Sequence, residues 1–276
     1  MTDSPVGEQE LLEIAVEATR MAGELLLERA RGGAEREVSS KSTPTDLVSE
    51  ADRTSERAIR TLLSERRPED GFLGEEGGSA ESDSGLCWVV DPLDGTVNFL
   101  FGIPQWNVSV AVRDEAGALA GAVFDPNRDE LFTATRRGPS LLNGPAGQIE
   151  LTGPQARGPA ESTQEGLSGV MVATGLAYDP NVRAAQAAVL ARLAPRVRDV
   201  RRFGSAALDL TWTAAGRYDA YFERSVKQWD IAAGTLICER AGLSVLELPA
   251  GEDLPWGIVV ARAAVAEQLL ELVGVP

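Results

Sequence analysis

The chain has 276 residues, which is enough for one large α/β domain or two small ones. Its 26 basic and 42 acidic residues give a net charge of −16, which opposes binding to nucleic-acid backbones and acidic membrane surfaces, so we expect neither as a partner. Histidine is absent, which excludes a Ser-His-Asp triad, a histidine-based zinc site and a phosphohistidine intermediate.

The composition also indicates where the protein works. The first residues, MTDSPVGEQE, are acidic and lack the basic and apolar regions of a secretory signal, and no apolar run is long enough to span a bilayer. Cys87 and Cys238 each lie in an apolar segment, so we expect reduced core residues rather than a disulfide pair. These features predict a cytoplasmic protein.

Two helices are predicted at the start of the chain. Apolar residues spaced three and four apart predict an amphipathic helix over 8–31, ended by the glycine pair 32–33. After a turn at 41–44, the pattern predicts a second helix from Asp46 to Arg67. The first turns of this helix carry acids of the kind that usually complement a helix dipole: Asp46, Glu50 and Asp52.

A short strand is predicted at the start of the segment 71–78, GFLGEEGG, which runs into the acidic pair Glu75-Glu76. Glu75 lies 16 residues before Asp91, where a second strand ends. The loop 79–85 between them is polar and suits a hairpin-like connection at the surface. Two neighbouring strands would then each end in acids at the same edge of one sheet.

The stretch 88–107, WVVDPLDGTVNFLFGIPQWN, is central to the chain. A buried strand is predicted over 87–90 and breaks at Asp91 into a loop that also holds Asp94. Two anions this close repel each other, and a shared cation or a shared proton relieves the repulsion. Gly95 permits an unusual backbone angle, and the N–H groups from Thr96 onward would begin a helical turn that can seat an anion. Carboxylates for a metal beside amides for an oxyanion suggest phosphate chemistry.

Two other interpretations of this loop are open. Asp-Pro and Asp-Gly are common turn formers, so the loop could be a plain turn. A calcium loop could use oxygen atoms of Asp91, Asp94 and Asn98, but the spacing differs from that of the helix-loop-helix type, which ends in a Glu at the twelfth position.

Alternating apolar segments after this loop predict a run of antiparallel strands at 108–112, 119–124 and 131–134. The Gly- and Pro-rich stretch 152–166 marks the best boundary between an N-terminal half, 1–151, and a C-terminal α/β half, 167–276. Helices and strands alternate in the second half, as in a sheet covered by helices. The expected elements are strands at 170–173, 197–200, 218–222, 243–248 and 257–260, and helices at 182–193, 205–215, 230–241 and 263–272.

Asp230 is a third acid of interest, predicted at the N-cap of a helix after Trp229. A capping Asp contributes about 1 kcal/mol and can serve only that purpose. The small residues 232–234 that follow would let another element pack closely. In an acidic protein without histidine, a phosphate site needs positive charge, and Mg²⁺ held by carboxylates supplies it.

Together these motifs resemble the inositol monophosphatase family of Mg²⁺-dependent, lithium-sensitive phosphatases. The resemblance is carried by residues 91–99 (DPLDGTVNF), 74–76 (GEE) and 229–234 (WDIAAG), with weaker support from 41–52 and 142–144. It implies an α+β or α/β fold, a layered α-β-α-β-α sandwich of the inositol monophosphatase and fructose-1,6-bisphosphatase type. It also implies one domain over residues 1–276 and a homodimer.

The resemblance implies roles for individual residues. Two or three Mg²⁺ ions would be held by Glu75, Asp91, Asp94, Asp230 and the carbonyl of Leu93. Thr96, hydrogen-bonded to Asp52, and Glu75 would activate the attacking water. The substrate would contact the metal ligands Glu75, Leu93, Asp94 and Asp230, the amides of Gly95 and Thr96, and Ser205, Ala206 and Glu223 around the leaving group.

These roles imply Mg²⁺-dependent hydrolysis of a small phosphomonoester, inositol 1-phosphate first, by direct attack of water. Histidinol phosphate, fructose 1,6-bisphosphate and a 3′-phosphonucleotide are alternative substrates, because residues 224–228 lie where family members with different substrates differ. A phosphatase with a phosphorylated Asp two residues before Asp94 is disfavoured, since that position is Pro92. An inactive metal-binding scaffold would have lost at least one of these residues, and all are present.

Overall fold

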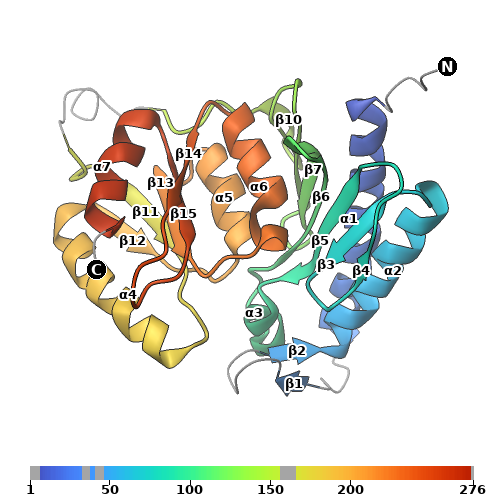
Figure 1. The fold of residues 1–276 in the computed structure, drawn as a ribbon, viewed down its shortest axis with the longest axis horizontal. Coiled ribbons are helices and arrows are strands. Elements are labelled where there is room, and N and C mark those ends of the chain that lie inside the picture. Colours follow the sequence, from blue (N-terminus) through green and yellow to red (C-terminus); the bar gives the residue numbers. More distant parts are fainter. Residues whose placement is uncertain (1–6, 33–37, 41–46, 156–165, 275–276) are drawn as a thin grey trace.

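The computed structural model describes residues 7–32, 38–40, 47–155 and 166–274. Helices and sheets alternate in five layers: two helices, a large sheet, two helices, a smaller sheet and two further helices (Figure 1). The predicted α-β-α-β-α sandwich is therefore confirmed. The turn expected at 41–44 and most of the boundary stretch 152–166 lie outside the described residues.

The larger sheet belongs to the N-terminal half, and its described part has eight strands in the order β10-β9-β8-β7-β6-β5-β3-β4. All neighbours run antiparallel except β3 and β5, which run parallel. The strands are β3 (Gly71–Gly74), β4 (Ser79–Ala80), β5 (Cys87–Asp94), β6 (Asn107–Asp114), β7 (Gly117–Asp125), β8 (Glu130–Thr135), β9 (Leu141–Gly144) and β10 (Gly147–Glu150).

The connection over 79–85 differs from the predicted hairpin. Its residues are exposed, as expected, but β4 pairs antiparallel with β3, and the chain then returns so that β5 lies parallel to β3 on the other side. A hairpin would have made the two strands antiparallel and separated their acids. The parallel arrangement is the one that brings both acidic ends to the same edge.

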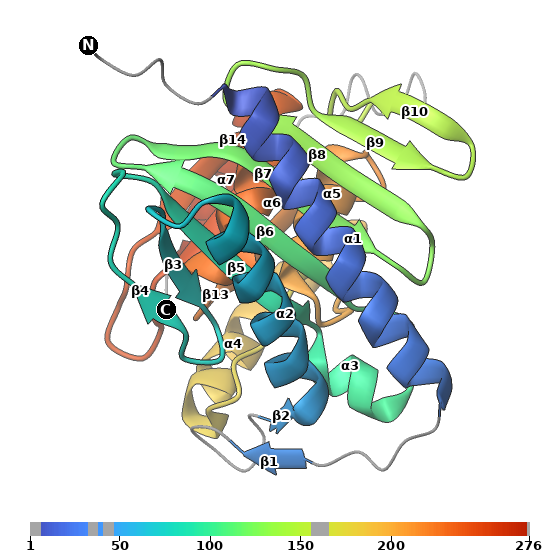
Figure 2. The same ribbon diagram turned by 90° about the vertical axis from the view of Figure 1, so that its right-hand side faces the viewer.

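Helices α1 (Glu8–Gly32) and α2 (Glu50–Arg66) cover one face of the larger sheet (Figure 2). The apolar stripe of α1 packs on β6 and β7, which confirms the predicted amphipathic helix. The second helix begins four residues later than predicted. Residues Leu47–Ser49 instead form β2, which pairs with β1 (Val38–Ser40). Backbone pairing between β1 and β2 replaces the expected helical turn. The spacing of apolar residues in the sequence does not indicate this pairing.

The C-terminal half forms a five-stranded sheet in the order β12-β11-β13-β15-β14 within the described residues. Its strands are β11 (Met171–Thr174), β12 (Asp199–Arg201), β13 (Ala220–Arg224), β14 (Ser244–Leu248) and β15 (Gly257–Ala261). Helices α4 (Pro180–Leu193) and α7 (Ala263–Gly274) pack on its outer face. These elements match the predicted alternation, with each end within two residues of the predicted one.

Two helices fill the layer between the sheets: α5 (Ala206–Ala214) and α6 (Gln228–Arg240). The predicted close packing of the small residues of α6 is present. A Cβ on Gly234 would lie 2.7 Å from Leu210 of α5, and a Cβ on Gly121 of β7 would lie 3.0 Å from Ala233 of α6. No described helix is both long and apolar enough to cross a bilayer.

This packing gives a stability test. A Gly234→Leu side chain cannot fit against Leu210 without moving α5 from α6, and overpacking of this kind costs roughly 1–3 kcal/mol. We expect a loss of that size in the free energy of unfolding, measured in urea. Gly251→Ala is the control, because Gly251 is exposed and a Cβ there meets nothing within 4 Å. Equal stability of the two variants would contradict close packing of the helices.

Candidate active site

Strand β5 delivers two carboxylates to the edge of the larger sheet. It continues beyond Val90, where we predicted a break, and reaches Asp94 through a register shift between Asp91 and Asp94. Gly95 then adopts a left-handed conformation (φ 94°) and precedes helix α3 (Thr96–Phe101). A Cβ on Gly95 would lie 2.8 Å from the Gln105 carbonyl oxygen. A side chain is therefore excluded at this turn by both the backbone angle and the available space.

The parallel neighbour β3 places Glu75 beside Asp91. Gly74 is paired with Val90, so the residues that follow each strand emerge at the same edge. The Glu75 N–H donates to the Val90 carbonyl at 3.2 Å, which extends the pairing by one residue. A hydrogen bond between the Glu75 and Asp91 side chains contributes to the raised pKa of Asp91.

The C-terminal half meets Asp94 through the start of α5. Ser205 precedes this helix, and its hydroxyl donates to Asp94 Oδ2 at 2.7 Å. The N–H groups of Ala206 and Ala207 donate to the same carboxylate at 3.2 and 2.8 Å. Asp94 thus accepts the N–H groups that begin α5, which have no partner within the helix. One carboxylate thereby links the two halves of the chain.

Asp230 approaches from α6, though not from the N-cap that we predicted. The N-cap is Lys227, and Asp230 is the third residue of the helix. Its Oδ2 accepts a hydrogen bond from the Lys227 N–H at 2.6 Å, so the side chain points back toward the start of the helix. The sequence identified the capping function correctly but misplaced the helix end by three residues.

The predicted residues line one cavity of about 250 Å³. Its walls include Glu75, Asp91, Leu93, Asp94, Gly95, Thr96, Ser205, Ala206, Glu223 and Asp230. Asp52 lies behind this wall, fully buried in α2, and accepts a hydrogen bond from Thr96 Oγ1 at 2.9 Å. The Thr96 hydroxyl also lies 3.1 Å from the Leu93 carbonyl oxygen. The expected Thr96–Asp52 pair is therefore present.

Crowding of acids is the dominant electrostatic feature of the cavity. Burial raises the pKa of Asp91, and the nearby charges of Glu75, Asp94 and Asp230 raise it further. Burial likewise raises the pKa of Asp230, with the charges of Glu75 and Asp94 adding to it and the Lys227 N–H opposing it. The pKa of Asp94 is raised by burial even though four hydrogen bonds lower it. The charged form of each of these three aspartates is therefore disfavoured in the cavity.

Glu223, on β13, also lines the cavity. Burial raises its pKa to about 7, while a hydrogen bond from the Tyr221 hydroxyl and the charge of Arg202 lower it. The Tyr221 hydroxyl donates to Glu223 Oε2 at 2.9 Å. The carboxylate lies flat against Gly175, where a Cβ would overlap it. Glu223 is therefore held in one position by Tyr221 and by the missing side chain of Gly175.

The donor set suits a hard divalent cation in kind and in charge, since carboxylate and carbonyl oxygens are the ligands that Mg²⁺ prefers. Glu75, Asp91, Asp94 and Asp230 supply the negative charge. Among the described residues, however, no three acidic or cysteine side chains lie close enough together to hold a metal ion in their present positions. Asp91, Asp94 and Asp230 each accept backbone N–H bonds here, so an ion would share these carboxylates with those donors.

Comparison with known proteins identifies the chain. A family model described as the inositol monophosphatase family matches residues 8–274. The chain belongs to the inositol monophosphatase family. An inositol-1-monophosphatase of Mycobacterium leprae is 44% identical over 249 residues, which cover 87% of this chain and 81% of the relative. Members of this family are phosphatases, so the protein is an enzyme that hydrolyses phosphate esters.

Other relatives carry a different name. A protein of Pasteurella multocida called Nus factor SuhB is 38% identical over 256 residues, covering 92% of this phosphatase and 91% of the relative. The crystal structure of extragenic suppressor protein suhB from Bartonella henselae has a TM-score of 0.84 and 32% identity, covering 96% of this chain and 98% of that one. These similarities agree with the layered fold described above.

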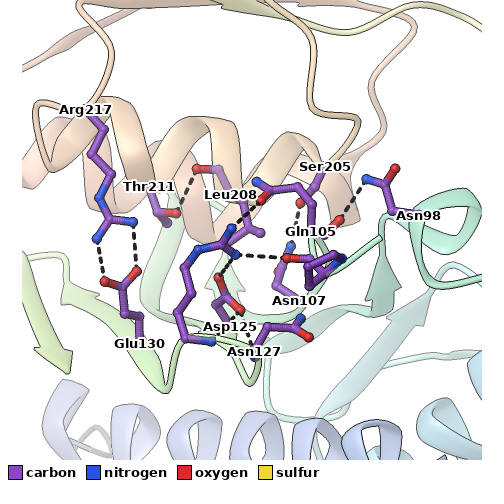
Figure 3. A network of polar contacts seen from close by, with 12 residues as sticks. Asn98, Gln105, Asn107, Asp125, Asn127, Glu130, Ser205, Leu208, Thr211 and Arg217 are labelled. Carbon is purple, nitrogen blue, oxygen red and sulfur yellow. Dashed lines mark hydrogen bonds and ion pairs between the residues drawn. The ribbon is translucent and has the colours of Figure 1, made fainter. Parts of the chain in front are cut away.

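Two asparagines of the phosphatase were not singled out as site residues from the sequence. Asn107 donates to Asp94 Oδ2 at 2.8 Å and to the Ser205 hydroxyl at 2.9 Å. Asn98 donates to the carbonyls of Gln105 and Phe203 at 2.8 and 2.7 Å. Figure 3 shows the Asn98, Gln105, Asn107 and Ser205 side chains of this network. The motif contained Asn98, but no local pattern predicts bonds to residues about 100 positions away.

The pKa of Glu223 gives a test by pH. A raised folded-state pKa means that the stabilising contribution of this group is complete below its usual value of 4.5 and is lost as pH rises through about 7. Glu223→Gln cannot ionise, so in EDTA it should gain stability over wild type by about 2 kcal/mol between about pH 5 and about pH 8. Urea unfolding measures this difference.

The exposed Glu252 supplies the matched control for this measurement. Glu252→Gln removes the same charge from the surface, and its stability relative to wild type should be nearly constant over the same pH range. A Glu223→Gln difference that is equally constant would show that Glu223 remains ionised in the folded protein.

Proposed function

We propose that this phosphatase hydrolyses inositol 1-phosphate to inositol and inorganic phosphate in a Mg²⁺-dependent reaction. Water supplies the new oxygen on phosphorus, the ester P–O bond breaks, and inositol leaves with a proton. The observation that supports this most is the convergence of Glu75, Asp91, Asp94 and Asp230 on one cavity that also contains the start of α3.

Two or three Mg²⁺ ions would be held by these four carboxylates and by the Leu93 carbonyl. When bound, they would neutralise phosphoryl charge, lower the pKa of a water and stabilise the departing oxygen. The raised pKa values of Asp91 and Asp230 support this assignment: burial and neighbouring carboxylate charges raise them, and a cation would offset both. Inhibition by lithium, as in the family, is part of the same proposal.

The Thr96 hydroxyl would orient the attacking water. Its one proton can be donated to Asp52 or to the Leu93 carbonyl, so the lone pairs of the hydroxyl oxygen can accept a hydrogen bond from water in the cavity. Glu75 would take up the proton that the water releases. Because Asp52 is fully buried, it would hold the Thr96 hydroxyl in one orientation throughout the reaction.

The phosphate would rest on the N–H groups of Gly95 and Thr96, and the leaving group would lie toward Ser205, Ala206 and Glu223. The start of α3 leaves N–H groups without helical acceptors, which suits phosphate oxygens. Glu223 would accept hydrogen bonds from inositol hydroxyls. A protonated amine would also suit Glu223, so histidinol phosphate belongs in the comparison with fructose 1,6-bisphosphate and a 3′-phosphonucleotide.

The structure also bears on proposals about the whole protein. We propose that residues 1–276 form one domain, because both sheets contribute to a single cavity. A cytoplasmic location is supported by Cys87 and Cys238, which are both free thiols. A homodimer is supported by the exposed apolar side chains of Phe101, Ile103 and Phe203.

The reaction and the substrate are tested together. Wild type should release phosphate from inositol 1-phosphate only with Mg²⁺, and Asp94→Asn should lower kcat/KM by about 10²-fold or more, because it removes a charged ligand. Asp253→Asn, at an exposed position, is the matched control. Phosphate release from a panel of phosphomonoesters at saturating Mg²⁺ ranks the substrates. If inositol phosphates rank last, the proposed substrate is wrong although the reaction class stands.

The contact between Glu223 and Gly175 gives a separate test of leaving-group binding. A Gly175→Ala methyl group would overlap the Glu223 carboxylate and displace it. We expect kcat/KM for inositol 1-phosphate to fall about ten-fold, by the loss of roughly one charge-assisted hydrogen bond, with Mg²⁺ affinity unchanged. Steady-state kinetics and calorimetry measure the two quantities, with Gly251→Ala as control. Unchanged kinetics would remove Glu223 from the leaving-group site.

A further inference from the structure

The first turns of α2 contact two separate segments of the active site. Asp52, Ser55 and Glu56 lie on one face of this helix, at spacings of three and four residues. Asp52 accepts from the Thr96 hydroxyl at 2.9 Å, and the Ser55 hydroxyl donates to the Pro92 carbonyl at 2.8 Å. Each of the three side chains is buried. The helix thus fixes the segment 91–96 from behind through two of them.

Glu56 reaches the other catalytic segment. Its Oε2 accepts a hydrogen bond from the Glu76 N–H at 2.8 Å, and the residue is only 7% exposed. This bond joins residues 20 positions apart and holds the backbone immediately after Glu75. No motif in the sequence marks Glu56, because the contact depends on how α2 lies against the end of β3.

Two glycines leave room for the Glu56 carboxylate. The turn after β3 closes with the Gly74 N–H donating to the Gly78 carbonyl at 2.8 Å, and the carboxylate lies within this turn. A Cβ on Gly74 would overlap Glu56 Oε2, and a Cβ on Gly78 would lie 2.8 Å from Oε1. The turn is therefore shaped around a carboxylate that itself lines no part of the catalytic cavity.

We propose that Glu56 is a positioning residue that sets Glu75 against Asp91 and thereby controls the affinity of the site for divalent cations. Asp91 is fixed to α2 through the segment that holds Pro92 and Thr96, and Glu56 fixes the Glu75 turn to the same helix. One rigid helix therefore sets the separation of two carboxylates that come from different strands. The inference rests on the cation-dependent site proposed above, but not on the identity of the substrate.

Calorimetry on the metal-free protein measures the effect directly, with Mg²⁺ and Mn²⁺ as probes. Glu56→Leu, which removes the acceptor, should weaken cation binding about ten-fold or more, the equivalent of one charge-assisted hydrogen bond. Glu56→Gln keeps an acceptor oxygen of similar reach and should recover part of the affinity. Glu65→Gln removes one charge from an exposed position of the same helix and should bind both cations as wild type does.

A second variant acts on Glu56 from the opposite side. A Gly78→Ala methyl group would press on Oε1 and displace the carboxylate, so it should also weaken cation binding, whereas Gly251→Ala should not. Because both changes act through one contact, Gly78→Ala should cost little further affinity in the Glu56→Leu background. In kinetics, raised Mg²⁺ should restore kcat in the Glu56 variants while the KM for inositol 1-phosphate stays constant.

The inference is overturned if Glu56→Leu lowers thermal stability but binds Mg²⁺ and Mn²⁺ as tightly as Glu65→Gln, since Glu56 would then have a purely structural role. It is also overturned if the wild type binds neither cation. Failure of the proposed substrate gives a different result: the cation affinities would follow the predicted order while inositol 1-phosphate was not hydrolysed.

Discussion

Repulsion among buried carboxylates is the constraint on which the rest of this structure depends. Glu75, Asp91, Asp94 and Asp230 share one cavity; burial raises the pKa of the three aspartates, and neighbouring carboxylate charges raise the pKa of Asp91 and Asp230 further. Such an arrangement persists only because the surrounding structure enforces it. The parallel pair β3 and β5, the left-handed Gly95 and the start of α6 each hold one part of the cluster.

Both halves of the chain hold these carboxylates in place. From the N-terminal half, α2 contacts the segment 91–96 and the turn after Glu75 through buried side chains. From the C-terminal half, the first N–H groups of α5 bind Asp94, and the close packing of α6 on β7 and α5 sets the depth of Asp230. The layers of the sandwich thus act as rigid supports for a small, strongly charged cavity.

The sequence predicted those features that depend on local physics. The apolar strand before Asp91, the need for glycine at position 95 and the helical turn from Thr96 all follow from neighbouring residues, and the structure contains each of them. The layered fold came from the family resemblance of the motifs. The meeting of Glu75 and Asp91 followed from two neighbouring strands that end in acids at one sheet edge, and the structure contains it. The addition of Asp230 relied on the resemblance, because no spacing rule links segments from different halves.

The wrong and missed predictions also have physical causes. Leu47–Ser49 pairs with a strand whose sequence signal is too short to recognise, so the start of α2 was placed too early. Asp230 caps its helix from inside, and a capping Asp at the N-cap or at the third position looks alike in sequence. Asn107 and Glu56 act through contacts between distant segments. Such contacts form only after the layers have assembled, so no pattern within one segment of the sequence predicts them.

Asp94 has a consequence for how this family can diverge. Besides facing the cavity, its carboxylate receives the Ser205 hydroxyl, the Asn107 amide and two N–H groups of α5, so it also joins the halves of the molecule. A homologue that had lost catalysis would still use this aspartate to hold its two halves together. Its retention in a distant homologue is thus poor evidence of surviving enzymatic activity.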